Sequence, residues 1–246
     1  MIDYAFFQTL ALPEMVLSAM ILLILLVDAY FPKRFMLIYG LAQTSVLASL
    51  LVVALGFSVV PQYGFDMQYV QDGLSSLLKL VMLIIMFFVF IYTRRAVRET
   101  LKMKSEFFIL TLLSLLGCMI MVSSASVLSI YLGVELFALP IYALIALERD
   151  CAYASEAAMK YFIMGAVASA LLLYGISLLY GLSGSLVFKD IAVYVQGGMS
   201  QSPILLFALV FIVAALCFKL GAVPFHMWLP DVYEGGSLSV VSYLGS

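Results

Sequence analysis

The sequence predicts an all-α protein: a polytopic membrane bundle of about seven transmembrane helices, the seventh of which is discontinuous. Hydrophobic residues make up 65% of the 246 positions and charged residues only 11%, whereas soluble domains contain roughly 45–50% and about 25%. Apolar runs of about 20 residues, the length that a helix needs to cross the bilayer core, recur along the chain. The last run holds a lysine, and the two prolines that follow it, Pro224 and Pro230, are expected to break the helix twice.

Seven apolar runs define the expected spans. Helix is expected in each because the bilayer core cannot satisfy the polar groups of open strands. The runs are also too long and too continuous for the strands of a membrane barrel. In chain order, the expected spans are 12–31, 36–60, 74–93, 107–122, 127–147, 157–181 and 204–223.

Basic residues in the connections predict the orientation. The odd-numbered connections hold eight Lys and Arg residues and the even-numbered ones hold only Lys189. Because basic residues are enriched on the cytoplasmic side, we expect a multi-pass chain with its N-terminus outside. We expect no cleavable signal peptide, since the first apolar run is long and a basic pair follows it. The eight residues are Lys33, Arg34, Arg94, Arg95, Arg98, Lys102, Lys104 and Arg149.

Composition argues against several other classes of site. A net charge of −2 gives no indication of nucleic-acid binding. The three cysteines, Cys118, Cys151 and Cys217, are far apart and form no CxxC pair, so neither a disulfide framework nor an iron–sulfur or zinc site is expected. The sequence also has no glycine-rich nucleotide-binding loop. We therefore expect this chain to bind no cofactor or metal itself.

Glu135 and Lys219 are the strongest candidates for chemistry. Glu135 lies eight residues into the fifth span, about 12 Å from its outer end at 1.5 Å per residue, and Lys219 lies in the seventh span. Ionisable residues at such depth usually belong to ion paths or proton relays. The alternative is a static ion pair that locks two helices. We favour proton transfer, and we expect the two side chains to meet inside the bundle because separate buried charges would be costly.

Other ionisable residues give weaker signals. Lys160, one turn after Glu156, fits either a functional role or a surface ion pair with an extended side chain. His226, at the helix break, fits either a proton path or a structural hydrogen-bond donor. We expect Lys79 to extend to the outer interface.

Three further predictions concern residues near helix ends and on one packing face. Glu14 and Asp28 are expected at the interfaces, near the two ends of the first span. Gly165 and Ser169 form a small-xxx-small pattern that predicts helix packing only.

Three segments carry a family resemblance. They read YLGVELFALPIYAL (131–144), SEAAMKYFIMGAVASALLLYGISLLYG (155–181) and FKLGAVPFHMWLPDVYEG (218–235). These segments resemble subunit N of bacterial respiratory complex I, the proton-translocating NADH:quinone oxidoreductase. By this resemblance, Glu135 and Lys219 match an essential glutamate and lysine, and Lys160 matches a lysine of helix 6. His226 and Pro224 match residues at the helix break, and Pro230 follows them.

The resemblance also implies a fold and a setting. The family has about fourteen helices arranged around two inverted five-helix repeats. We therefore expect residues 1–106 to be a three-helix region, and residues 107–246 to be an incomplete antiporter-like repeat that ends at the start of another helix. Expected partners are the lipid bilayer of the bacterial inner membrane and other membrane subunits, with NADH, FMN, iron–sulfur clusters and quinone on the partner subunits. The chain would be part of an enzyme without containing a redox centre.

Other functions remain open at this point. A cation/proton antiporter subunit or a related membrane hydrogenase subunit would share the broken-helix segment. A retinal-binding seven-helix protein would also place a lysine in helix 7, but it needs a carboxylate counter-ion in the third helix, where this chain has Lys79. An inactive fragment with a structural or assembly role is the remaining alternative.

Overall fold

The computed structural model describes residues 10–31, 34–100, 104–148, 150–197 and 202–245. Within these residues, six helices are long and apolar enough to cross a membrane, and a seventh apolar helix is shorter. The all-α membrane fold is therefore confirmed. The six are α2 (Leu12–Tyr30), α3 (Phe35–Leu55), α4 (Gly73–Thr100), α5 (Lys104–Val122), α6 (Val127–Ile145) and α7 (Ala152–Ser183), and the shorter helix is α9 (Pro203–Lys219).

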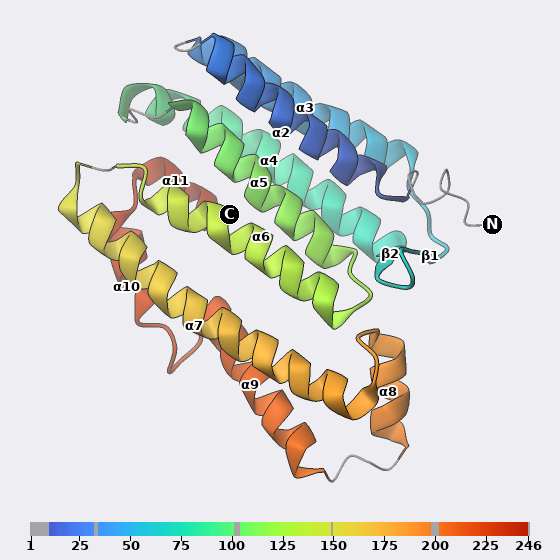
Figure 1. The fold of residues 1–246 in the computed structure, drawn as a ribbon. Helices are drawn as coiled ribbons and strands as arrows, with labels where there is room; N and C mark the ends of the chain where they lie inside the picture. The colour runs from blue at the N-terminus through green and yellow to red at the C-terminus, as the bar shows by residue number, and fades with distance from the viewer. Residues whose placement is uncertain (1–9, 32–33, 101–103, 149, 198–201, 246) are drawn as a thin grey trace.

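The long helices run side by side in the order α2/α3, α4/α5, α6 and α7/α9 across the molecule (Figure 1). Short elements connect them: an antiparallel hairpin of β1 (Gln62–Gly64) and β2 (Tyr69–Gln71), and helices α8 (Phe188–Gln196), α10 (Trp228–Gly235) and α11 (Leu238–Leu244). The hairpin and α8 lie at one end of the bundle, whereas α10 packs against the start of α7 at the other end.

Local sequence explains where two of the helices begin. The Asp72 carboxylate accepts a hydrogen bond from the Ser75 backbone N–H at 2.7 Å, and the Ser75 hydroxyl accepts one from the Asp72 N–H at 2.9 Å. These bonds satisfy backbone groups at the start of α4. Ser126 caps α6 in the same way through the Ser129 N–H at 3.1 Å.

Two glycines bring α5 and α6 into backbone contact. A Cβ on Gly133 would lie 2.9 Å from the Met121 backbone nitrogen and 3.0 Å from the Gly117 carbonyl oxygen. A Cβ on Gly117 would in turn lie 2.8 Å from the Gly133 carbonyl oxygen. Only residues without side chains permit this approach, which fixes the helix that carries Glu135 against its neighbour.

Several helix ends differ from those predicted. α3 ends at Leu55 and not at Val60, because the chain turns there toward the hairpin. α4 continues to Thr100, so the arginines expected in the following loop lie in its last turns. α9 ends at Lys219, four residues earlier than expected. Of the basic residues used to predict orientation, Lys33, Lys102 and Arg149 lie outside the described residues.

Candidate functional site

The structure brings Glu135 and Lys219 together, as predicted. Glu135 projects from the middle of α6, and Lys219 is the last residue of α9. The Lys219 Nζ lies 3.7 Å from the Glu135 Oε1, and the side chains are 14% and 22% exposed. The pair is thus an ion pair shielded on most sides by helices.

The position of Lys219 results from the break after α9. The helix stops at Lys219, Gly221 has a positive φ of 65°, and helix begins again only at Trp228. The Trp228 indole N–H donates to the Phe218 carbonyl at 3.1 Å and so bridges the break. Lys219 is the basic residue in the last turn of α9, where the helix dipole favours a positive charge.

Two hydroxyl groups complete the surroundings of the pair. The Ser169 hydroxyl on α7 donates a hydrogen bond to the Glu135 Oε1, and the Lys219 ammonium donates to the Tyr142 hydroxyl at 3.5 Å. Tyr142 reaches this position because residue 165 is glycine; a Cβ there would overlap the tyrosine hydroxyl. The prediction that Gly165 and Ser169 only pack helices was therefore incomplete, since both shape the site.

Lys160 lies apart from this pair, on the exposed side of α7. Its ammonium is 2.9 Å from the Glu156 carboxylate and 2.8 Å from the Asp231 carboxylate of α10. The Glu156 partner was predicted from the one-turn spacing, whereas Asp231 was not. Lys160 thus ties α10 to α7 at an exposed position.

The remaining predicted residues belong to the break. His226 is exposed and lies in the irregular segment between α9 and α10, together with Pro224. Pro230 was expected to break the helix a second time, but it lies in the first turn of α10. A proline is tolerated there because the first backbone N–H groups of a helix have no partner within it.

A second buried ion pair was not predicted. Lys79 on α4 is only 2% exposed, and its Nζ lies 2.5 Å from the Oε1 of Glu14 on α2. The Lys79 ammonium also donates to the Tyr69 hydroxyl at 2.8 Å. The expectation that Lys79 extends to the interface was therefore wrong, whereas Glu14 does lie near the end of its span, in the first turn of α2, but is buried and paired.

The sequence contains one signal that is consistent with this pair but does not establish it. Glu14 lies in the first turn of α2 and Lys79 near the start of α4, at the same end of two parallel spans, so opposite charges occur at similar depth. Depth alone does not tell an inward-facing lysine from one that extends to the interface. The direction that Lys79 faces is set by packing among α2, α4 and α5.

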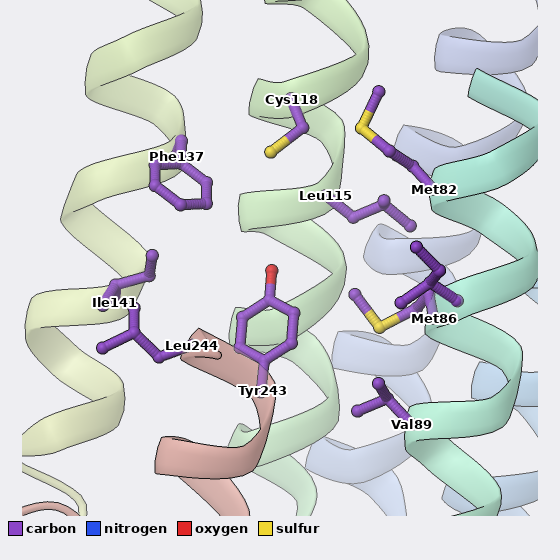
Figure 2. A pocket seen from close by; sticks show the side chains of 10 residues that line it. Met82, Met86, Val89, Leu115, Cys118, Phe137, Ile141, Tyr243 and Leu244 are labelled. Carbon is purple, nitrogen blue, oxygen red and sulfur yellow. The ribbon is translucent and has the colours of Figure 1, made fainter. Parts of the chain in front are cut away.

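A separate apolar cavity of about 220 Å³ lies among α4, α5 and α6. Tyr243 of α11 enters it from one side (Figure 2). The Tyr243 hydroxyl is 2.5 Å from the Ser114 hydroxyl. No charged side chain lines this cavity among the described residues. It therefore has none of the features of the Glu135–Lys219 site.

Known proteins resemble this chain in sequence. Residues 124–246 match the family described as NADH:quinone oxidoreductase/Mrp antiporter, transmembrane region. NADH-quinone oxidoreductase subunit N of Thiobacillus denitrificans is 45% identical over 238 residues, which cover 96% of this chain and 49% of that protein. The chain thus spans about half the length of the curated relatives that it matches.

Solved structures resemble it in fold. A chain of respiratory complex I from Thermus thermophilus, solved with bound aureothin, matches with a TM-score of 0.78 and 28% identity, over 95% of this chain and 50% of that one. A chain of the membrane-bound sulfane sulfur reductase, an archaeal respiratory membrane complex, matches with a TM-score of 0.83 over 95% of this chain and 49% of that one. At 22% identity, the second match is a likeness of fold alone.

Proposed function

Because the chain belongs to the NADH:quinone oxidoreductase/Mrp antiporter membrane family, we propose that it takes part in proton translocation coupled to quinone reduction in respiratory complex I. The observation that supports this most directly is the Glu135–Lys219 pair, in which a largely buried ammonium meets a carboxylate 3.7 Å away at a helix break. Intramembrane acids and bases of this kind are typical of proton relays.

The geometry suggests how the pair would work. While Lys219 is protonated, its ammonium is held by the Glu135 carboxylate and donates to the Tyr142 hydroxyl. When the two side chains move apart, burial favours the neutral amine, and Lys219 releases its proton to water at the break. Glu135 meanwhile keeps the hydrogen bond from Ser169. The distance between the two groups would thus control the release of one proton.

We propose supporting roles for two further residues. His226 lies exposed in the break, close in sequence to Lys219, where it would exchange protons with water. Lys160 would act through Asp231, because this ion pair joins α7, which carries Ser169, to the helix that follows the break. A shift of α10 would therefore move α7, whose Ser169 contacts Glu135, and also the segment that follows Lys219.

The proposed setting is the bacterial inner membrane, with the N-terminus outside and other membrane subunits of complex I as partners. NADH, FMN, iron–sulfur clusters and quinone would be held by those partners, and redox chemistry there would drive the change in this chain. A charge moved against 100 mV costs about 2.3 kcal/mol, so the driving energy has to come from the rest of the complex.

The test is Lys219→Ala in the assembled complex. We expect proton pumping by membrane vesicles to fall several-fold relative to NADH oxidation, while the amount of assembled complex stays close to normal. Lys189→Ala is the matched control, since Lys189 is an exposed lysine of α8 away from the pair. Normal pumping by the Lys219 variant would contradict the proposal, and pumping that requires sodium would favour a cation/proton antiporter.

A further inference from the structure

The Glu14–Lys79 pair lies in a part of the fold that the proposed function does not use. It joins α2 to α4, whereas Glu135 and Lys219 lie on α6 and α9. Tyr69 connects it to the hairpin: its hydroxyl lies 3.1 Å from the Glu14 Oε1 and 3.3 Å from the Leu10 carbonyl oxygen. Three polar side chains from three elements thus meet in one buried cluster.

The packing of these helices does not require a charge pair. α2, α3 and α4 already pack through a continuous apolar core that includes Leu17, Ile21 and Leu83. Replacing a buried ion pair by apolar residues of similar volume is often neutral or stabilising, because both charges must lose their water. The Glu14–Lys79 charges are therefore not needed for these helices to pack, and a proton-exchange role would use the charges themselves.

The Glu14 carboxylate is only half engaged. Its Oε1 meets both Lys79 and Tyr69, but its Oε2 is buried without a hydrogen-bond partner among the described residues. The Ser76 hydroxyl, one turn before Lys79 on α4, is also buried without a partner within that part of the chain. A carboxylate oxygen with no donor is available to bind a proton.

The cluster lies next to an exposed turn, since the ring of Tyr69 contacts the ring of Phe65. Tyr69 belongs to β2, and the hairpin turn beside it, Phe65–Met67, has positive φ angles and exposes Phe65 and Asp66. The Val70 N–H donates to the Ser123 carbonyl at 2.8 Å, which holds this hairpin against the end of α5. The Glu14 side chain therefore lies beneath an exposed turn at the end of the bundle.

Tyr69 is suited to be a neutral hydrogen-bonding partner in this cluster. Burial raises the pKa of its hydroxyl, and the nearby Glu14 carboxylate adds to the effect. The phenol therefore keeps its own proton and can donate it to Glu14 or to the Leu10 carbonyl. A switch between these two acceptors would accompany a change in the charge of Glu14.

Other charged groups around the cluster are few. Asp72, just before α4, acts on Lys79 from the side of the hairpin. α3 contains no acidic or basic residue other than Tyr39, and α5 has its charged residues, Lys104 and Glu106, in the first turn at the opposite end. Lys79 is thus the principal cation near Glu14 among the described residues.

We propose that Glu14, Lys79 and Tyr69 form a second proton-exchange site, separate from the Glu135–Lys219 pair and open toward the hairpin end of the bundle. In the exchange, hydronium at that end loses a proton, and a new O–H bond forms at the Glu14 Oε2 to give the neutral carboxylic acid and water. The reverse step releases the proton to the same side. Tyr69 remains a phenol throughout.

The test is infrared difference spectroscopy of the full chain in lipid nanodiscs, recorded as the pH is changed. The carbonyl stretch of a protonated carboxylic acid should appear as the pH falls, and Glu14→Gln should remove one such band. Asp28→Asn, at the opposite end of α2, is the matched control and should leave this band in place. Lys79→Met removes the cation that contacts Glu14 and should change the frequency of this band.

Two further variants make the result decisive. Glu14→Asp keeps an acid in the cluster with a shorter side chain, so the assigned band should persist at a changed frequency even if the glutamine variant fails to fold. Glu135→Gln should leave the band unchanged, which separates this site from the proposed function. A band unaffected by both Glu14 substitutions in folded protein would overturn the proposal, and Glu14 would then belong to a static ion pair.

Discussion

A few single residues determine how a charge is held near the middle of the bundle. Lys219 lies at the end of a helix and faces a carboxylate, and Glu135 receives a hydroxyl donor from Ser169. The sequence predicted the two charged residues because depth and composition mark them as unusual. It did not predict the role of Ser169, since a serine in a small-xxx-small pattern is typical of packing alone.

Ser169→Ala tests the contribution of that hydroxyl. The substitution removes a hydrogen bond to a charged group, which is worth about 1.5–3 kcal/mol, so we expect a loss of stability of that order and a several-fold loss of pumping. Stability is measured by unfolding in mixed micelles and pumping in vesicles. Ser18→Ala is the control, because the Ser18 hydroxyl bonds only the Met15 carbonyl within its own helix. Equal stability and equal pumping in the two variants would show that the Ser169 hydrogen bond contributes to neither.

At the scale of secondary-structure elements, the apolar runs predicted which segments form helices better than they predicted where those helices end. Hydropathy does not register where a helix stops, and the end of α9 moved from 223 to Lys219 because the backbone turns at Gly221. That shift matters for the site, since it puts the lysine at a helix end. The buried Lys79–Glu14 contact was missed because it depends on how α2 and α4 are rotated against one another.

Gly133→Ala tests the close approach of α5 and α6. The added methyl would meet backbone atoms of α5 at about 3 Å or less, and overpacking of this kind costs roughly 1–3 kcal/mol. Gly40→Ala is the matched control because nothing lies within 4 Å of its added Cβ on α3. There the better helix propensity of alanine should stabilise the protein by up to about 1 kcal/mol. If both substitutions stabilise the protein, the α5–α6 contact can accommodate a side chain at position 133, and the prediction is wrong.

At the scale of the whole molecule, the two ion pairs lie in different halves of the helical array, α2–α4 and α6–α9. The hairpin and α8 lie at one end and α10 at the other. The basic residues in the odd connections predict that the hairpin end faces outward and the α10 end faces the cytoplasm. This orientation is predicted from charge alone, whereas the side-by-side order of the helices comes from packing.

Cysteine labelling tests this orientation. Asp66→Cys in the hairpin turn should react with a membrane-impermeant maleimide in spheroplasts, and Glu234→Cys on α10 should react only in inverted vesicles, since both positions are exposed. The background protein has its native cysteines replaced by serine, namely Cys118, Cys151 and Cys217. The reverse pattern of labelling would invert the predicted topology.

The most direct test of the central proposal is Lys219→Arg in the assembled complex, with proton pumping measured per NADH oxidised. Arginine keeps the positive charge beside Glu135 but does not lose its proton in proteins. If Lys219 exchanges a proton, we expect pumping by this variant to fall nearly as far as in Lys219→Ala while assembly is preserved. Pumping at the normal ratio with arginine at this position would contradict the account, because a fixed charge would then be enough.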